Sequence, residues 1–166
     1  MYALYYTTVR LFHLYPSASV HHPSTARRDT LRRVLAAGCT LAFVMHVSYL
    51  TLLPRFDYTY NIIFNLVVGT IHNLLWLLYS LPTSASPFHR FPERPKTYRP
   101  SFVYKAAVFV LLTTAATALE LFDFPPWFRT VDAHALWHLS TAPIAGFWYE
   151  FLLQDAGDEG WRSKLE

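Results

Sequence analysis

The chain of 166 residues is 53% hydrophobic and only 15% charged, whereas an average soluble domain carries roughly 25% charged residues. A single cysteine, Cys39, excludes a disulfide scaffold and a multi-cysteine zinc site. The net charge of +3 would suit a nucleic-acid partner. However, long apolar segments of the sequence contain no charged residue, which is typical of membrane spans. The sequence therefore predicts an all-α integral membrane protein, a polytopic transmembrane helix bundle with no nucleic-acid partner.

Five apolar segments divide the chain. The last four are each about 20 residues long, enough to cross about 30 Å of hydrocarbon as helices. The first would reach only about 22 Å, so we expect Met1 to lie within a helix and the chain to be the C-terminal part of a longer protein. The expected spans are 1–15 (partial), 34–53, 60–81, 102–121 and 133–153, in one bundle over 1–155 followed by a tail at 156–166.

Basic residues predict the orientation of this bundle. The segment 16–33 carries four arginines and the segment 82–105 carries five basic residues, whereas the loops on the opposite side carry only Arg55 and Arg129. The positive-inside rule therefore places the basic loops and the C-terminus in the cytoplasm. Aromatic residues near the expected span ends resemble the aromatic belts of membrane proteins: Tyr79, Trp127, Trp148 and Tyr149.

The second and third segments carry polar groups that would face other helices. His46 and His72 lie inside the expected spans, where ionisable residues are functional candidates. Inter-helix hydrogen bonding is the simpler interpretation for both, and metal ligation is the alternative. In the third segment Asn61, Asn65 and Gly69 share a stripe with His72, which is typical of helix packing in membranes.

Carboxylates flank the loop between the fourth and fifth segments. Glu120 and Asp123 are expected on the same side of the membrane as the start of the fifth segment. They are candidate acid/base groups or groups that orient metal ligands, and a solvated loop is the alternative. Asp132 has two compatible interpretations, a helix N-cap and an acceptor that orients a ligating imidazole.

The fifth segment opens with the sharpest candidate site. His134 and His138 are four residues apart, so both imidazoles lie on one helix face within reach of one metal ion. Ala135 stands where the metalloprotease motif HExxH has its glutamate, so that motif does not apply. Spacing alone leaves metal binding and a polar helix contact as alternatives.

Four stretches of the sequence resemble the post-GPI-attachment-to-proteins factor 3 family and its fungal members. They are FDYTYNIIFN at 56–65, LELFDFPPW at 119–127, VDAHALWH at 131–138 and WYEFLLQD at 148–155. The stretches occur in the order of the family, and the resemblance covers nearly the whole chain.

The resemblance implies a seven-helix fold, of which this chain holds about five helices, in a superfamily with the alkaline ceramidases and the progestin-and-adipoQ receptors. It implies a multi-pass protein of the endoplasmic reticulum membrane, or alternatively the Golgi membrane. The implied activity is that of a GPI-specific phospholipase A2-type hydrolase, which removes the sn-2 acyl chain from GPI-anchored proteins. Membrane lipids and GPI-anchored proteins would be its partners.

The implied cofactor is Zn²⁺, ligated by His134 and His138. A third histidine, with a serine and an aspartate, belongs to a Phe-His-x-Arg-Asp type motif in the family, and the sequence lacks that motif. This leaves the chain as part of an active hydrolase or as an inactive fragment of one. A ceramidase-like amidase and a non-catalytic heptahelical receptor or folding factor are the alternative functions.

Overall fold

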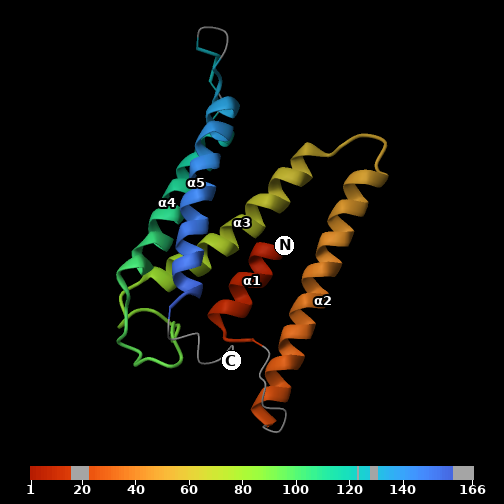
Figure 1. Cartoon of the computed structure of the whole chain (residues 1–166). Coiled ribbons are helices and arrows are strands. Elements are labelled where there is room, and N and C mark those ends of the chain that lie inside the picture. Colours follow the sequence, from red (N-terminus) through yellow and green to blue (C-terminus); the bar gives the residue numbers. More distant parts are fainter. Residues whose placement is uncertain (16–22, 123, 128–130, 159–166) are drawn as a thin grey trace. The chain divides into compact units, whose positions relative to one another are not determined.

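The computed structural model describes residues 1–15, 23–122, 124–127 and 131–158 (Figure 1). Every regular element within these residues is a helix, which confirms the predicted all-α fold. Among the described residues, β-type pairing is confined to an isolated bridge between Trp127 and Val131. The elements are α1 (Tyr2–Leu11), α2 (Pro23–Leu52), α3 (Tyr58–Ser80), the short 3-10 helix η1 (Ser101–Val103), α4 (Tyr104–Leu121) and α5 (Ala133–Ala156).

Three of the described helices are long and apolar enough to cross a bilayer: Ala26–Leu52, Tyr58–Ser80 and Ser101–Leu119. The chain is therefore a multi-pass membrane protein. Helix α1 has 10 residues and reaches only about 15 Å. Helix α5, with 24 residues, has the necessary length but is not one of the three, so its crossing of the membrane stays a prediction.

Large hydrophobic side chains lie exposed along the spanning helices. Leu41 and Phe43 of α2 are 60% and 53% exposed, and Ile63 and Leu74 of α3 are 56% and 53% exposed. So much exposed apolar area is unfavourable in water but favourable against lipid tails, which are themselves apolar. A helix can lie in lipid because its backbone polar groups are satisfied internally. The exposed surface thus agrees with a membrane location.

The chain folds as two compact units, Met1–Leu75 and Trp76–Glu166, which are described in turn. In the first unit α1 lies beside α2, and a short turn joins α2 to α3 (Figure 1). Asp57 caps the start of α3, because its Oδ1 accepts the backbone N–H of Tyr60 at 2.9 Å. Its Oδ2 accepts the hydroxyl of Tyr49 at 3.3 Å, which ties the end of α2 to the start of α3.

The second unit is built on α4 and α5, which pack against each other in opposite directions (Figure 1). Trp76, near the end of α3, makes edge-to-face contacts with Trp148 and Phe151 of α5 at centroid distances of 4.9 and 5.4 Å. Phe109 of α4 stacks on Trp148 at 4.0 Å. Aromatic pairs of this kind contribute about 0.5–1.5 kcal/mol each beyond their buried area. The cluster therefore forms the core of this unit.

A buried polar contact lies beside that core. The hydroxyl of Tyr79 donates to Oδ1 of Asp155 at 2.6 Å, and both residues are fully buried. The prediction that Tyr79 belongs to an aromatic belt is wrong, because its ring packs against Trp76 and Phe151 and none of it is exposed. The hydroxyl finds its polar partner inside the protein instead of at the lipid headgroups.

Two arginines cap the C-terminal end of α3. Nε of Arg90 donates to the carbonyl of Tyr79 at 2.6 Å, and its Nη2 donates to the carbonyl of Leu81. Nη2 of Arg99 donates to the carbonyl of Ser80 at 2.9 Å. The last carbonyls of a helix have no partner within the helix, and cations there also favour its dipole. Burial lowers the pKa of the Arg90 guanidinium, which nevertheless stays charged at neutral pH.

Candidate functional site

The candidate site lies at the start of α5. Asp132 is the N-cap residue of this helix, with extended backbone, and its Oδ1 accepts the backbone N–H of Ala135 at 2.7 Å. This confirms that Asp132 acts as a cap. The first helical turn, which carries His134, is therefore held by a side chain in its own sequence.

A backbone bridge closes the loop just before this cap. Trp127 and Val131 exchange two hydrogen bonds, N to O at 2.8 and 3.1 Å. A cavity of about 350 Å³ lies beside the loop, lined by Phe124, Pro125, Pro126 and Asp132. The prolines and the bridge restrict the backbone conformations available just before the first residue of α5.

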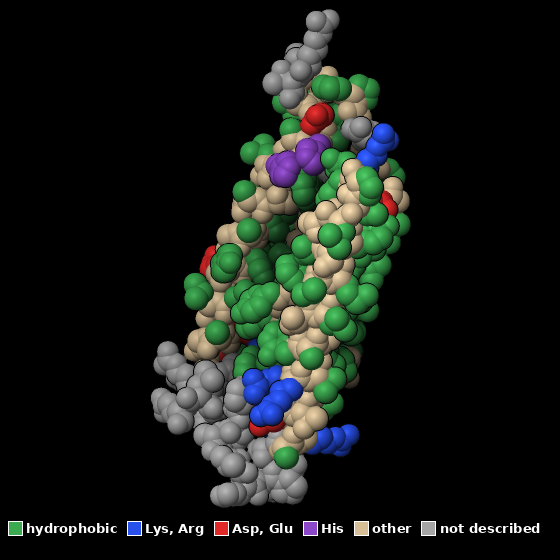
Figure 2. Space-filling model, turned by 90° about the vertical axis from the view of Figure 1, so that its right-hand side faces the viewer, with side chains coloured by type: hydrophobic (Ala, Val, Ile, Leu, Met, Phe, Trp, Pro, Cys, Tyr) green, Lys and Arg blue, Asp and Glu red, His purple; other side chains and the backbone are tan. Residues whose placement is uncertain are grey.

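His134 and His138 are brought together as the spacing predicts. Their Nε2 atoms lie 3.0 Å apart, and their rings are perpendicular, with centroids 4.6 Å apart. Both side chains are exposed, and histidine side chains (purple) touch one another on the surface in Figure 2. The ring of Trp137 lies against both imidazoles, and its centroid is 5.5 Å from that of His134 and 4.5 Å from that of His138. Two accessible nitrogens thus point to one place.

The distance between the two nitrogens suits a shared metal ion. Two nitrogens about 2.0–2.1 Å from one tetrahedral zinc lie about 3.3 Å apart. The observed 3.0 Å between Nε2 of His134 and Nε2 of His138 needs only a small ring adjustment to reach that spacing. The same 3.0 Å also suits a direct hydrogen bond between two neutral imidazoles of opposite tautomers, so both interpretations of the sequence remain open.

The described residues contain no group of three histidine, cysteine, aspartate or glutamate side chains that could hold a metal ion. The histidine pair therefore fits two positions of a metal site and not the whole of one. A tightly held zinc has at least three protein ligands. Within the described part of the chain, no third ligand is brought to this pair.

The two other predicted carboxylates are less well defined. Glu120 lies in the last turn of α4, although its side chain is not described. Asp123 lies outside the described residues. Their proposed acid/base roles stay predictions.

His46 of α2 and His72 of α3 belong to the first unit, whereas His134 and His138 belong to the second. The ring of His46 stacks on Phe64 at 3.9 Å, and its buried Nδ1 has no hydrogen-bond partner among the described residues. Nδ1 of His72 lies 3.4 Å from Oδ1 of Asn73 in its own helix. Ligation by either histidine stays a prediction.

Sequence reasoning missed Arg90 and Asp155, which with Tyr79 form the buried polar centre of the second unit. The sequence alone marks Arg90 as one of the basic residues that set topology, and Asp155 as the last residue of the expected bundle. The one available signal was a lone acid in an otherwise apolar helix end, WYEFLLQD at 148–155. An acid there needs a partner if it is buried.

Fold and site define a class, the multi-pass helical membrane proteins whose last described helix opens with a pair of accessible histidines one turn apart. The chain belongs to the Per1-like family, which it matches over residues 1–156. This confirms the resemblance seen in the sequence.

Curated relatives are similar to the chain over most of its length. It is 36% identical over 140 residues to the GPI-specific phospholipase A2-like PGAP3 of Cricetulus griseus, covering 84% of this chain and 38% of that protein. It is 40% identical over 116 residues to the human protein of the same name, covering 70% and 32%. The Protein PER1 homolog of Schizosaccharomyces pombe is 42% identical over 115 residues, covering 68% and 30%.

The chain spans about a third of the length of these relatives. No solved structure matches it.

Proposed function

We propose that the full-length protein remodels the lipid of GPI anchors by hydrolysing the ester of the sn-2 acyl chain. The observation that carries the proposal is the 3.0 Å approach of the His134 and His138 nitrogens at the start of α5. The names of the relatives support the substrate class, since they describe GPI-specific phospholipase A2-like proteins. A secretory-pathway membrane, the endoplasmic reticulum or alternatively the Golgi, would be the site of action, with the C-terminus in the cytoplasm.

In this proposal His134 and His138 hold a zinc ion through their Nε2 atoms, together with ligands from elsewhere in the full-length protein. A zinc ion bound there would supply a Lewis acid and would lower the pKa of a coordinated water toward about 7. The histidines must be neutral to ligate, so acid pH would release the metal.

The other residues of the site have positioning and proton-transfer roles in the proposal. Asp132 fixes the first turn of α5 through its bond to Ala135, and thereby the direction of the His134 ring. Trp137 covers one side of the pair and limits the access of water. Glu120 and Asp123 are the candidates to accept a proton from the attacking water at a carboxylate oxygen.

The test uses the full-length protein with His134→Ala and His138→Ala. Each variant should lower the zinc content of the purified protein, with affinity reduced by more than about 100-fold, because even residues that only support a ligand cost 10- to 100-fold. GPI-anchored proteins from cells carrying either variant should retain the unsaturated sn-2 chain. Leu139→Ala is the matched control, since Leu139 is 72% exposed on the same helix and outside the pair.

Three outcomes would contradict the proposal. Unchanged acyl composition in both histidine variants would remove the ligand assignment. Accumulation of ceramide with normally remodelled GPI would instead support an amidase of the ceramidase kind. Zinc bound at full occupancy without acyl release by purified protein would favour a receptor or folding factor.

A further inference from the structure

A groove lies between the end of α1 and the start of α2, entirely within the first unit. Its volume of about 690 Å³ falls within the roughly 300–1,000 Å³ of small-molecule sites. Its lining is mostly apolar, with two guanidinium groups at one end: Phe12, Leu14, Leu31, Val34, Arg27 and Arg28. The apolar members include exposed side chains, with Phe12 at 53% and Val34 at 64%.

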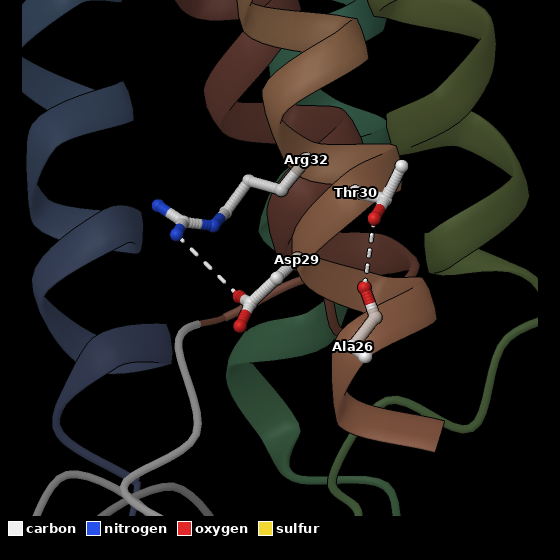
Figure 3. Close-up of polar contacts among 4 residues, drawn as sticks. All are labelled: Ala26, Asp29, Thr30 and Arg32. Carbon is white, nitrogen blue, oxygen red and sulfur yellow. Dashed lines mark hydrogen bonds and ion pairs between the residues drawn. The ribbon is translucent and has the colours of Figure 1, made fainter. Parts of the chain in front are cut away.

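The two arginines of this groove have no polar partner within the described part of the chain. Arg32, one turn further along α2, is occupied by an ion pair, in which Nη2 lies 3.5 Å from Oδ1 of Asp29 (Figure 3). Arg27 and Arg28 make no such contact with any described residue. Figure 2 shows basic side chains (blue) gathered on the surface. Among the described residues, the groove therefore presents two guanidinium groups without an ion-pair partner.

The position of these residues along α2 adds a second argument. The part of α2 that is long and apolar enough to cross a membrane begins at Ala26, so Arg27 and Arg28 lie at its start, where basic residues are expected close to the lipid phosphates. The helix is continuous here, since α2 runs from Pro23 to Leu52, and Oγ1 of Thr30 also donates to the carbonyl of Ala26 at 2.9 Å (Figure 3). Val34 lies about 10 Å further along the helix axis than Arg27, at 1.5 Å per residue. The groove thus changes from cationic to apolar over the distance that separates a lipid headgroup from its acyl chains.

We propose that this groove binds one glycerophospholipid with an anionic headgroup. Its phosphate accepts hydrogen bonds from Arg27 and Arg28, because guanidinium groups pair with phosphate in a two-pronged geometry. Its acyl chain lies along Leu31 and Val34, and Phe12 of α1 closes the opposite wall.

Charge selects the lipid class. None of the described residues lining the groove is acidic, so nothing there would balance the ammonium of phosphatidylcholine. Phosphatidylserine and phosphatidylinositol carry a net negative charge, which the two arginines neutralise. The proposal is independent of the hydrolytic function, since it concerns a different unit and involves no reaction.

The test measures lipid that stays with the purified full-length protein. The protein is placed in nanodiscs of equal parts phosphatidylcholine and phosphatidylserine. Native mass spectrometry then releases the protein from the nanodisc and identifies the lipid that stays bound to it. The wild type should retain one phosphatidylserine in preference to phosphatidylcholine. Arg27→Gln with Arg28→Gln should weaken this retention about 30-fold, which corresponds to about 1 kcal/mol for each basic group.

Matched variants separate a built site from general attraction to an anionic membrane. Arg33→Gln removes the same charge as Arg28→Gln from the same helix, but Arg33 does not line the groove. Val34→Trp fills the groove without a change of charge, at a side chain that is 64% exposed. Retention should persist in the first variant and fall in the second. If Arg33→Gln weakens retention as much as Arg28→Gln, or Val34→Trp leaves it unchanged, the site does not exist.

Discussion

The contact between Tyr79 and Asp155 joins α3 to α5 and can be tested by removing a single atom. Tyr79→Phe deletes the hydroxyl that donates to Oδ1 of Asp155 at 2.6 Å, and leaves the ring in its packing against Trp76 and Phe151. Because both partners are fully buried, water cannot replace the lost donor. The variant therefore isolates one hydrogen bond.

A hydrogen bond to a charged group contributes about 1.5–3 kcal/mol to stability. Asp155 has at least one further interaction, so the carboxylate is not left wholly uncompensated and we expect a loss of about 2 kcal/mol. A chain of this size loses about 2–4 °C of Tm per kcal/mol, so Tm should fall by about 4 to 8 °C.

Thermal unfolding in detergent micelles, followed by tryptophan fluorescence, measures this loss, because the Trp76 ring lies 5.1 Å from that of Tyr79. Tyr149→Phe is the matched control: Tyr149 lies on α5 like Asp155 but is 68% exposed. The control should melt like the wild type. If Tyr79→Phe also melts like the control, the buried hydrogen bond contributes nothing and the reasoning is wrong.

Two further changes test the helix ends. Asp132→Ala removes the cap on Ala135 and should cost about 1 kcal/mol, seen as faster amide exchange in the first turn of α5, whereas Asp132→Asn should restore protection because asparagine caps equally well. Equal exchange in all three proteins would refute the capping role. In Arg90→Lys a single ammonium replaces the two separate nitrogens that donate to the carbonyls of Tyr79 and Leu81. The free energy of unfolding should fall by about 1–2 kcal/mol in the same melting assay. An unchanged Tm would contradict this.

Much of the fold and part of the candidate site could be predicted because they depend on local geometry. Apolar runs long enough to cross a bilayer must be helical, since only a helix satisfies their backbone groups in lipid, and α2, α3 and α4 lie where such runs occur. Residues four apart meet on one face of any helix, so the approach of His134 and His138 followed from their spacing alone. Capping by Asp132 is also local, because its partner is the backbone N–H of Ala135, three residues further along the chain.

The sequence by itself thus determined which segments are helical, which can cross a membrane, and where two histidines meet. Tertiary structure alone decided the partners of Tyr79, which is 76 residues from Asp155, and the capture of the α3 carbonyls by Arg90. Contacts over such separations depend on which helix faces pack together, and no spacing within one helix encodes that choice. An apolar ring with a hydroxyl satisfies the composition of a membrane interface and of a protein core equally well, so only packing could place Tyr79 in the core.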